Sequence, residues 1–294
     1  MKNNLLKNII ICICLFFMYY ILTNNKLINE NIIFAINLWI TKVFPSLFPM
    51  FIINELLIHL GLPNIISKTF KKAGIYIYIF ILSIFSGTPS NAIIIKELYN
   101  TNKINSNDAS YALSFTYFSN PIFIYTMLHN IFPTNTIIKI IIIHYISNIF
   151  IMLIYKNKLT KRTYLLDKEK NINVSNVINT AIKKSLNTLI TILGTITFYI
   201  IISTIIINLF DFSDIINTLF KGFLEITQGL SSINNLNMSI KLKEIIAITI
   251  ISFGGISIHS QIQNIVSNTT IQYKYFFIGR LIHTLISFIL IFLF

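Results

Sequence analysis

Eight apolar stretches, most of them close to the length that spans a bilayer, constrain the fold of this chain more than any other feature. A membrane-spanning helix needs about 20 apolar residues. Only 11% of the 294 residues are charged and the mean hydropathy is +0.73, whereas about a quarter of the residues in a soluble domain are charged. The sequence therefore predicts an all-α polytopic membrane protein with about 7–9 membrane segments. The stretches are residues 5–22, 47–60 (expected to extend backward past Pro45), 75–95, 109–128, 137–155, 186–210, 245–266 and 275–294.

Two of these stretches are interrupted by polar segments that contain Gly, Ser and, in one case, Pro. The segments are SGTPSNA (residues 86–92) and SFGGISIHSQI (residues 252–262). Backbone groups freed by a broken helix cost several kcal/mol each in hydrocarbon, so such breaks persist only where protein or a water-filled cavity satisfies them. In transporters that place is the solute site. We therefore expect two broken or re-entrant segments that meet at one polar cavity near the membrane centre.

Basic residues gather at the ends of the apolar stretches. The net charge of +13 is concentrated at residues 68–72, 156–170 and 183–184, which is the pattern of cytoplasmic loops. We take the basic residues 68–72 to be cytoplasmic. If residues 75–95, 109–128 and 137–155 then all crossed the membrane, the basic loop that begins at residue 156 would face outward, against the pattern. One of the three stretches is therefore expected not to cross. No basic and aromatic surface stands outside the membrane, which argues against nucleic-acid binding.

The polar loop divides the chain into comparable halves. We expect an uncleaved N-terminal membrane helix (residues 1–30), a first half (31–155), a cytoplasmic loop (156–177) and a second half (178–294). A break follows a Phe in each half, at FSGTPS and FGGISI, which suggests a two-fold internal repeat. Residues 214–230 are expected to form an amphipathic helix at the interface or a half-helix that enters the bundle.

The first break offers hydroxyls, a side-chain amide and backbone amides at a helix N-terminus, which suit an anionic or polar ligand. The alternative is an ordinary turn outside the membrane, although the uncharged flanks favour a site. A second Pro-containing break, SNP at residues 119–121, offers the same chemistry, and a simple Pro kink is its alternative. The candidate residues are Ser86, Gly87, Thr88, Ser90, Asn91, Ser119 and Asn120.

The break in the second half is followed by alternating polar residues, a pattern unlike that of a lipid-facing helix. Its candidate site residues are Gly254, Gly255, Ser257, His259 and Gln261. A lone His on an apolar face is usually hydrogen-bonded packing, which is the alternative for His259.

Ionisable residues inside apolar stretches are costly and are commonly functional. Glu55 and His59 share a helix face four residues apart, and with Glu225 they are candidates for proton or ion coupling; Glu55 could instead lie near the headgroups. Arg280 lies deep in the last stretch and is the candidate cation for an anionic solute or for a glutamate. His144 is expected to be structural.

No catalytic or nucleotide-binding motif occurs, so the sequence predicts no enzyme, no metal site and no cofactor. Cys12 and Cys14 are two residues apart on a helix and point about 200° apart, which argues for packing and against a disulfide.

In seven segments that span most of its length, including the breaks described above, the chain resembles the sporulation integral membrane protein family that carries nucleoside-transporter-like gate domains. Thr88, Asn91 and Ile93 stand where the family pattern has an aromatic residue, Gly and Lys. The matching segments, in order, are WITKVFPSLFPMFIINELL (39–57), FSGTPSNA (85–92), ALSFTYFSNPIFI (112–124), HY (144–145), LEITQGL (224–230), SFGGISIHSQI (252–262) and RLIHT (280–284).

The resemblance implies a permease-type fold with two gate repeats and, in spore formers, a role in moving dipicolinate across the outer forespore membrane. We therefore expect a bacterial membrane transporter of a small anionic carboxylate, in contact with the lipid bilayer and compatible with a homo-oligomer. Three alternatives are a transporter of a neutral, nucleoside-like solute, a membrane scaffold of a sporulation complex, and an intramembrane enzyme.

Overall fold

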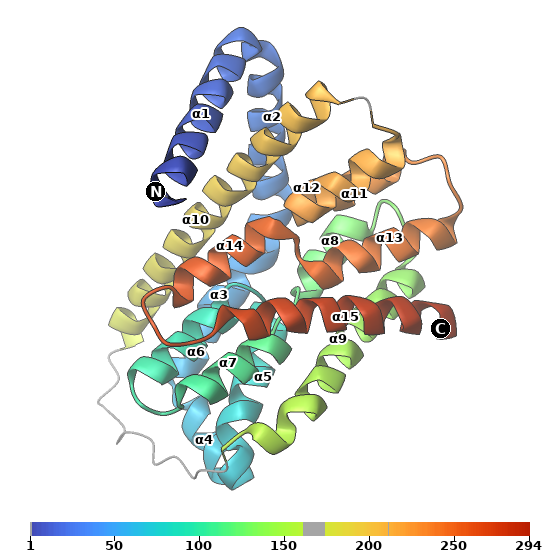
Figure 1. Cartoon of the computed structure of the whole chain (residues 1–294). Helices are drawn as coiled ribbons and strands as arrows, with labels where there is room; N and C mark the ends of the chain where they lie inside the picture. The colour runs from blue at the N-terminus through green and yellow to red at the C-terminus, as the bar shows by residue number, and fades with distance from the viewer. Residues whose placement is uncertain (1, 161–173, 211) are drawn as a thin grey trace.

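The regular elements of the chain are helical throughout the part that the structure, a computed structural model, describes: residues 2–160, 174–210 and 212–294 (Figure 1). This confirms the predicted all-α class. The helices are α1 (Lys2–Thr23), α2 (Asn25–Leu38), α3 (Phe44–His59), α4 (Leu62–Phe70), α5 (Gly74–Ser86), α6 (Ser90–Asn100), α7 (Ser106–Phe115), α8 (Pro121–Leu128), α9 (Thr134–Tyr155), α10 (Val174–Leu209), α11 (Asp214–Leu224), α12 (Ile226–Ser232), α13 (Ile240–Phe253), α14 (Gly255–Val266) and α15 (Tyr273–Leu293).

Within the described residues, six helical segments are long and apolar enough to cross a membrane. They are Asn4–Thr23, Asn25–His59, Thr134–Lys158, Ser175–Leu209, Ile240–Val266 and Tyr273–Leu293. The second joins α2 and α3 through a π-helical turn, Trp39–Val43, so the expected extension past Pro45 is confirmed. The chain is thus an integral membrane protein built of helices.

The two halves of the chain contain interrupted helix pairs in a similar order. In the first half α3 is followed by α4, then by two interrupted pairs, α5–α6 and α7–α8, and then by α9. In the second half α10 is followed by α11–α12, α13–α14 and α15. This order is compatible with an internal repeat, which stays a prediction.

The expected segment boundaries differ from the helices in two places. The N-terminal helix ends at Thr23 and α2 begins at Asn25, so no element ends at residue 30. Helix α10 already begins at Val174, inside the loop expected over 156–177, and residues 161–173 of that loop lie outside the described residues. The cytoplasmic side of the loop stays a prediction.

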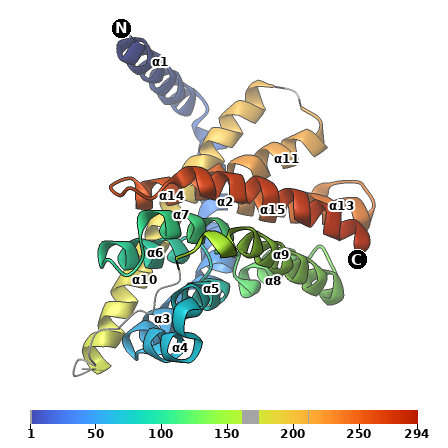
Figure 2. The same ribbon diagram turned by 60° about the horizontal axis from the view of Figure 1, so that its bottom comes forward.

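The helices pack into one bundle, with α1 lying apart from most of it. Helix α15 packs against α7, α9 and α13, while α10 packs against α2 and α3. Figure 2 shows α1 projecting away from the other helices. Only 6% of the most apolar stretch of α1 is buried inside the protein. An apolar helix that is exposed all round is suited to a surrounding of lipid.

The two breaks within each half lie close together, and those of the first half are joined by hydrogen bonds. In the first half the backbone N–H of Thr88 donates to the Phe118 carbonyl (3.1 Å), and the Asn120 side chain donates to the Phe85 carbonyl. In the second half a Cβ on Gly255 would lie 3.2 Å from the Ile226 backbone nitrogen, which shows how closely the two breaks approach. Backbone groups left unpaired by a break find partners in protein, as the low-dielectric interior requires.

Candidate functional site

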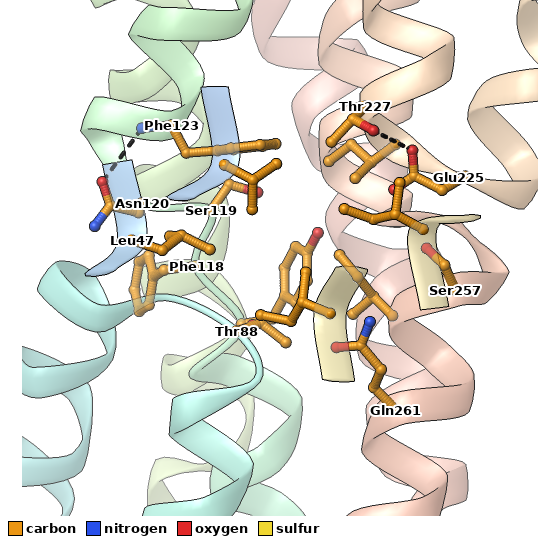
Figure 3. Close-up of a pocket in the computed structure, with 16 residues that line it drawn as sticks. Leu47, Thr88, Phe118, Ser119, Asn120, Phe123, Glu225, Thr227, Ser257 and Gln261 are labelled. Carbon is orange, nitrogen blue, oxygen red and sulfur yellow. Dashed lines mark hydrogen bonds between the residues drawn. The ribbon is translucent and has the colours of Figure 1, made fainter. Parts of the chain in front are cut away.

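A small cavity lies where the four breaks converge, and we call it the central cavity (Figure 3). About 50 Å³ of it is open to the centre of a water molecule, which is room for a few waters. The three breaks predicted from the sequence all reach it, through Thr88, Asn120 and Ser257. The lining residues are Val43, Leu47, Thr88, Tyr117, Phe118, Ser119, Asn120, Phe123, Ile192, Ile196, Glu225, Ile226, Thr227, Ser257, Ile258 and Gln261.

Two hydroxyls in the wall of the central cavity have no hydrogen-bond partner. They belong to Thr88 and Ser257, whose Oγ1 and Oγ atoms are buried, and only 1% of Ser257 is exposed. A buried polar group without a partner costs about 1–3 kcal/mol. These two hydroxyls, from opposite halves of the chain, therefore lack a partner of the kind that a solute or water supplies.

Glu225 is the charged residue of the cavity lining and is 1% exposed. Its carboxylate accepts the backbone N–H of Gln228 (2.9 Å) and the hydroxyl of Thr227, so it caps the N-terminus of α12. No ion pair among the described residues includes it. The carboxylate is held by hydrogen bonds rather than by a basic side chain.

Helix N-termini surround the central cavity. Helices α6, α8, α12 and α14 begin directly after the four breaks, and residues of each break or of the first helical turn line the cavity. At α8 the Asn120 side chain accepts the backbone N–H groups of Ile122 (2.8 Å) and Phe123 (3.3 Å). A helix N-terminus carries roughly half a positive charge. The Glu225 carboxylate already caps that of α12, and those of α6, α8 and α14 make the cavity more favourable to negative charge.

Arg280 does not line the central cavity but lies behind its wall. It is 0% exposed, and its Nη2 donates to the Ser114 carbonyl (2.8 Å) and to Asn148 Oδ1 (3.1 Å). The guanidinium carbon lies 4.3 Å from the centre of the Tyr117 ring, and Tyr117 is itself a lining residue. Arg280 therefore contacts Tyr117 of the wall rather than the central cavity itself.

Several other predicted residues shape the breaks without lining the central cavity. His259 bonds through Nδ1 to the Tyr273 hydroxyl (2.7 Å) and through Nε2 to the Phe253 carbonyl (3.1 Å), which closes the end of α13. Ser86 donates to the Leu82 carbonyl (2.8 Å). The others in this group are Gly87, Asn91, Gly254 and Gly255.

His144 has a structural contact, as the sequence suggests. Its Nε2 accepts the backbone N–H of Ser119 (3.0 Å), which fixes the extended segment before α8.

Of all predicted site residues, those that reach the central cavity are Thr88, Ser119, Asn120, Glu225, Ser257 and Gln261.

Glu55 and Ser90 lie at a different place, which we call the lateral cavity. It lies between α3, α6 and α10, and about 280 Å³ of it is open to the centre of a water molecule. Glu55 accepts from Lys184 Nζ (3.0 Å), and His59 Nε2 is 3.9 Å from it. The residues that line this cavity are Phe51, Asn54, Glu55, Ser90, Ile93, Ile94, Glu97, Lys184, Ser185, Asn187 and Thr188.

Sequence reasoning did not identify the break at Glu225 or the part played by Thr227. The sequence predicts an amphipathic helix or a half-helix over residues 214–230. In the structure α11 ends at Leu224, and Glu225 has extended backbone angles (φ −145°, ψ 120°). A signal was present, because a glutamate followed by Thr and Gln in apolar surroundings supplies both a buried carboxylate and its donors. The apolar lining from α10, Ile192 and Ile196, carries no such signal.

The comparisons with known proteins point to one kind of relative. The chain is 26% identical to "Sporulation integral membrane protein YlbJ" of Bacillus subtilis (strain 168) over 297 aligned residues, which cover 84% of this chain and 72% of the relative. No family model matches the chain, and no solved structure matches it. The similarity agrees with the membrane architecture and extends through most of the sequence.

Proposed function

We propose that this protein is a permease that carries a small anionic solute through the membrane and binds it in the central cavity. The observation that carries the proposal is the convergence of four helix breaks on one cavity with unpartnered hydroxyls from both halves of the chain. A protein that served only as a scaffold would gain nothing from burying such groups, since each costs free energy.

The class of solute follows from the surroundings of the cavity. The N-terminal ends of α6, α8 and α14 favour a negatively charged group, and the unpartnered hydroxyls of Thr88 and Ser257 can donate to a carboxylate. The sporulation relative and the resemblance to proteins with gate domains suggest dipicolinate in a spore-forming cell. Because the cavity holds only a few waters in this conformation, entry of such a solute requires the walls to move apart.

Glu225 suggests how the charge of the solute is balanced. A second carboxylate beside it would be repelled unless one of the two carried a proton, so we propose that Glu225 takes up a proton when an anion binds. The same residue supports the second candidate, a neutral nucleoside-like solute, because the charged side chain in the lining is acidic. A carboxylate is a good acceptor for the hydroxyl and amide donors of a neutral solute.

Uptake into liposomes that contain the purified protein tests the proposal. We expect accumulation of labelled dipicolinate, and we expect Ser257→Ala to reduce it at least about tenfold, since a hydrogen bond to a charged group contributes about 1.5–3 kcal/mol. Ser260→Ala is the matched control, because Ser260 lies on the same helix but its hydroxyl donates to the Ser257 carbonyl. Uptake of uridine without dipicolinate would favour the neutral solute, and uptake of neither would favour a scaffold.

A further inference from the structure

The lateral cavity contains oxygen atoms that have no partner and that the proposed transport site does not use. Asn54 Oδ1 and Ser185 Oγ are buried without a hydrogen bond, and both residues line this cavity, where they are 4% and 2% exposed. Asn54 comes from α3 and Ser185 from α10, so the unpartnered oxygens belong to facing helices. Buried oxygens of this kind are acceptors that lack a donor or a cation.

Two carboxylates join these neutral oxygens in the same wall. Glu55 lies next to Asn54 on α3, with 17% of its side chain exposed, and Glu97 comes from α6. Lys184 is the basic residue of the wall, and His59 stands 3.9 Å from Glu55 outside it. Two carboxylates and one ammonium leave one unit of negative charge, which one monovalent cation would neutralise.

We propose that the lateral cavity binds a small monovalent cation, sodium or potassium, through Glu55, Glu97 and the oxygens of Asn54 and Ser185. Hard cations prefer carboxylate, amide and hydroxyl oxygens. Among the described residues, no group of three or more His, Cys, Asp and Glu side chains could hold a metal ion, and a site with so few charged ligands is suited to a monovalent rather than a divalent ion.

Lys184 is a built-in competitor for this site. Its ammonium lies 3.0 Å from Glu55 Oε2, while half of its side chain is exposed, so it can move away into solvent. A cation that binds Glu55 competes with the ammonium for the same carboxylate, while Lys184 stays in the wall of the cavity. Removal of the Glu55 carboxylate should therefore weaken cation binding, and removal of the Lys184 ammonium should strengthen it.

Trp39 provides a signal for the measurement. It is the one tryptophan in the sequence, and its Nε1 donates to the Leu189 carbonyl (3.0 Å), directly after Thr188 in the wall of the lateral cavity. The full-length protein in detergent is titrated with NaCl or KCl at constant ionic strength, with choline as the replacement ion, while Trp39 fluorescence and the midpoint of thermal unfolding are recorded. No solute is present, so the result is independent of whether the protein transports one.

We expect saturable binding of sodium or potassium that choline does not reproduce. Glu55→Gln should weaken it at least about tenfold and Lys184→Met should strengthen it by a similar factor, as expected for a unit charge in close contact. Lys183→Met is the matched control, because Lys183 does not line the cavity. If Glu55→Gln fails to fold, Asn54→Ala takes its place.

The proposal is overturned if choline gives the same response as sodium and potassium, or if magnesium binds in preference to both. It is also overturned if Lys184→Met leaves the affinity unchanged or changes it no more than Lys183→Met does.

Discussion

At the scale of single residues, Arg280 is a buried cation whose charge is not matched by a carboxylate among the described residues. Its Nε and Nη1 have no hydrogen-bond partner, and it lies in no ion pair of the described part of the chain. Burial of an uncompensated charge is expensive. The positive charge lies behind the Tyr117 ring, which lines the central cavity. We therefore expect the charge of Arg280 to attract an anion into the cavity, although Arg280 does not touch the anion.

Replacement of Arg280 tests this electrostatic effect. We expect Arg280→Gln to lower the affinity for dipicolinate about tenfold, since it removes a unit charge from a site of low dielectric. Arg280→Lys keeps the charge but loses the planar group that lies over Tyr117, so it should restore only part of the affinity. Equilibrium binding to the purified variants measures both. An unchanged affinity in folded Arg280→Gln protein would show that the solute does not sense this charge.

At the scale of elements, the end of α13 depends on the absence of a side chain at Gly254. Its φ is 91°, a left-handed conformation that costs a residue with a Cβ about 1–2 kcal/mol. A Cβ there would also lie 2.5 Å from the Tyr117 hydroxyl oxygen, and that hydroxyl donates to the Ile251 carbonyl (3.2 Å). The break in the second half is thereby fitted to a residue of the first half.

Gly254→Ala should therefore lower the thermal unfolding midpoint in detergent by several degrees. The control is Gly194→Ala on α10, where an added Cβ meets nothing within 4 Å, and where Ala should stabilise the helix by about 0.5–1 kcal/mol. Scanning calorimetry, or a thermal shift assay whose dye does not react with thiols, compares the unfolding midpoints of the two variants. Equal midpoints for both variants would contradict the close contact with Tyr117.

At the scale of the whole molecule, the two halves meet through their breaks, and the loop between them should set the orientation in the membrane. The basic residues of 156–173 predict that this loop is cytoplasmic. Asn157, in the described part of the loop, is a suitable position for a single cysteine after Cys12 and Cys14 are replaced by Ser. An impermeant thiol reagent should label it only after the cell membrane is opened. Labelling in intact cells would place the loop outside.

The sequence by itself determined the helical membrane architecture and three of the four breaks, because apolar length, Pro and Gly act locally. A run of about 20 apolar residues has few alternatives to a helix in lipid. The breaks at Gly87, Asn120 and Gly254 follow from residues that end or begin helices wherever they occur. The structure confirms the all-α class, the extension of α3 past Pro45 and a cavity shared by the segments SGTPSNA and SFGGISIHSQI.

Only the tertiary structure decided which polar residues share a cavity, because that depends on contacts between distant helices. Glu55 and Glu225 carry the same chemistry, yet packing sends Glu55 to Lys184 on α10 and Glu225 to the central cavity. Arg280 reaches Asn148 and Tyr117 instead of the cavity. Residue type and spacing fix the side of a helix on which a group lies, but the neighbour on that side is fixed by how the helices pack.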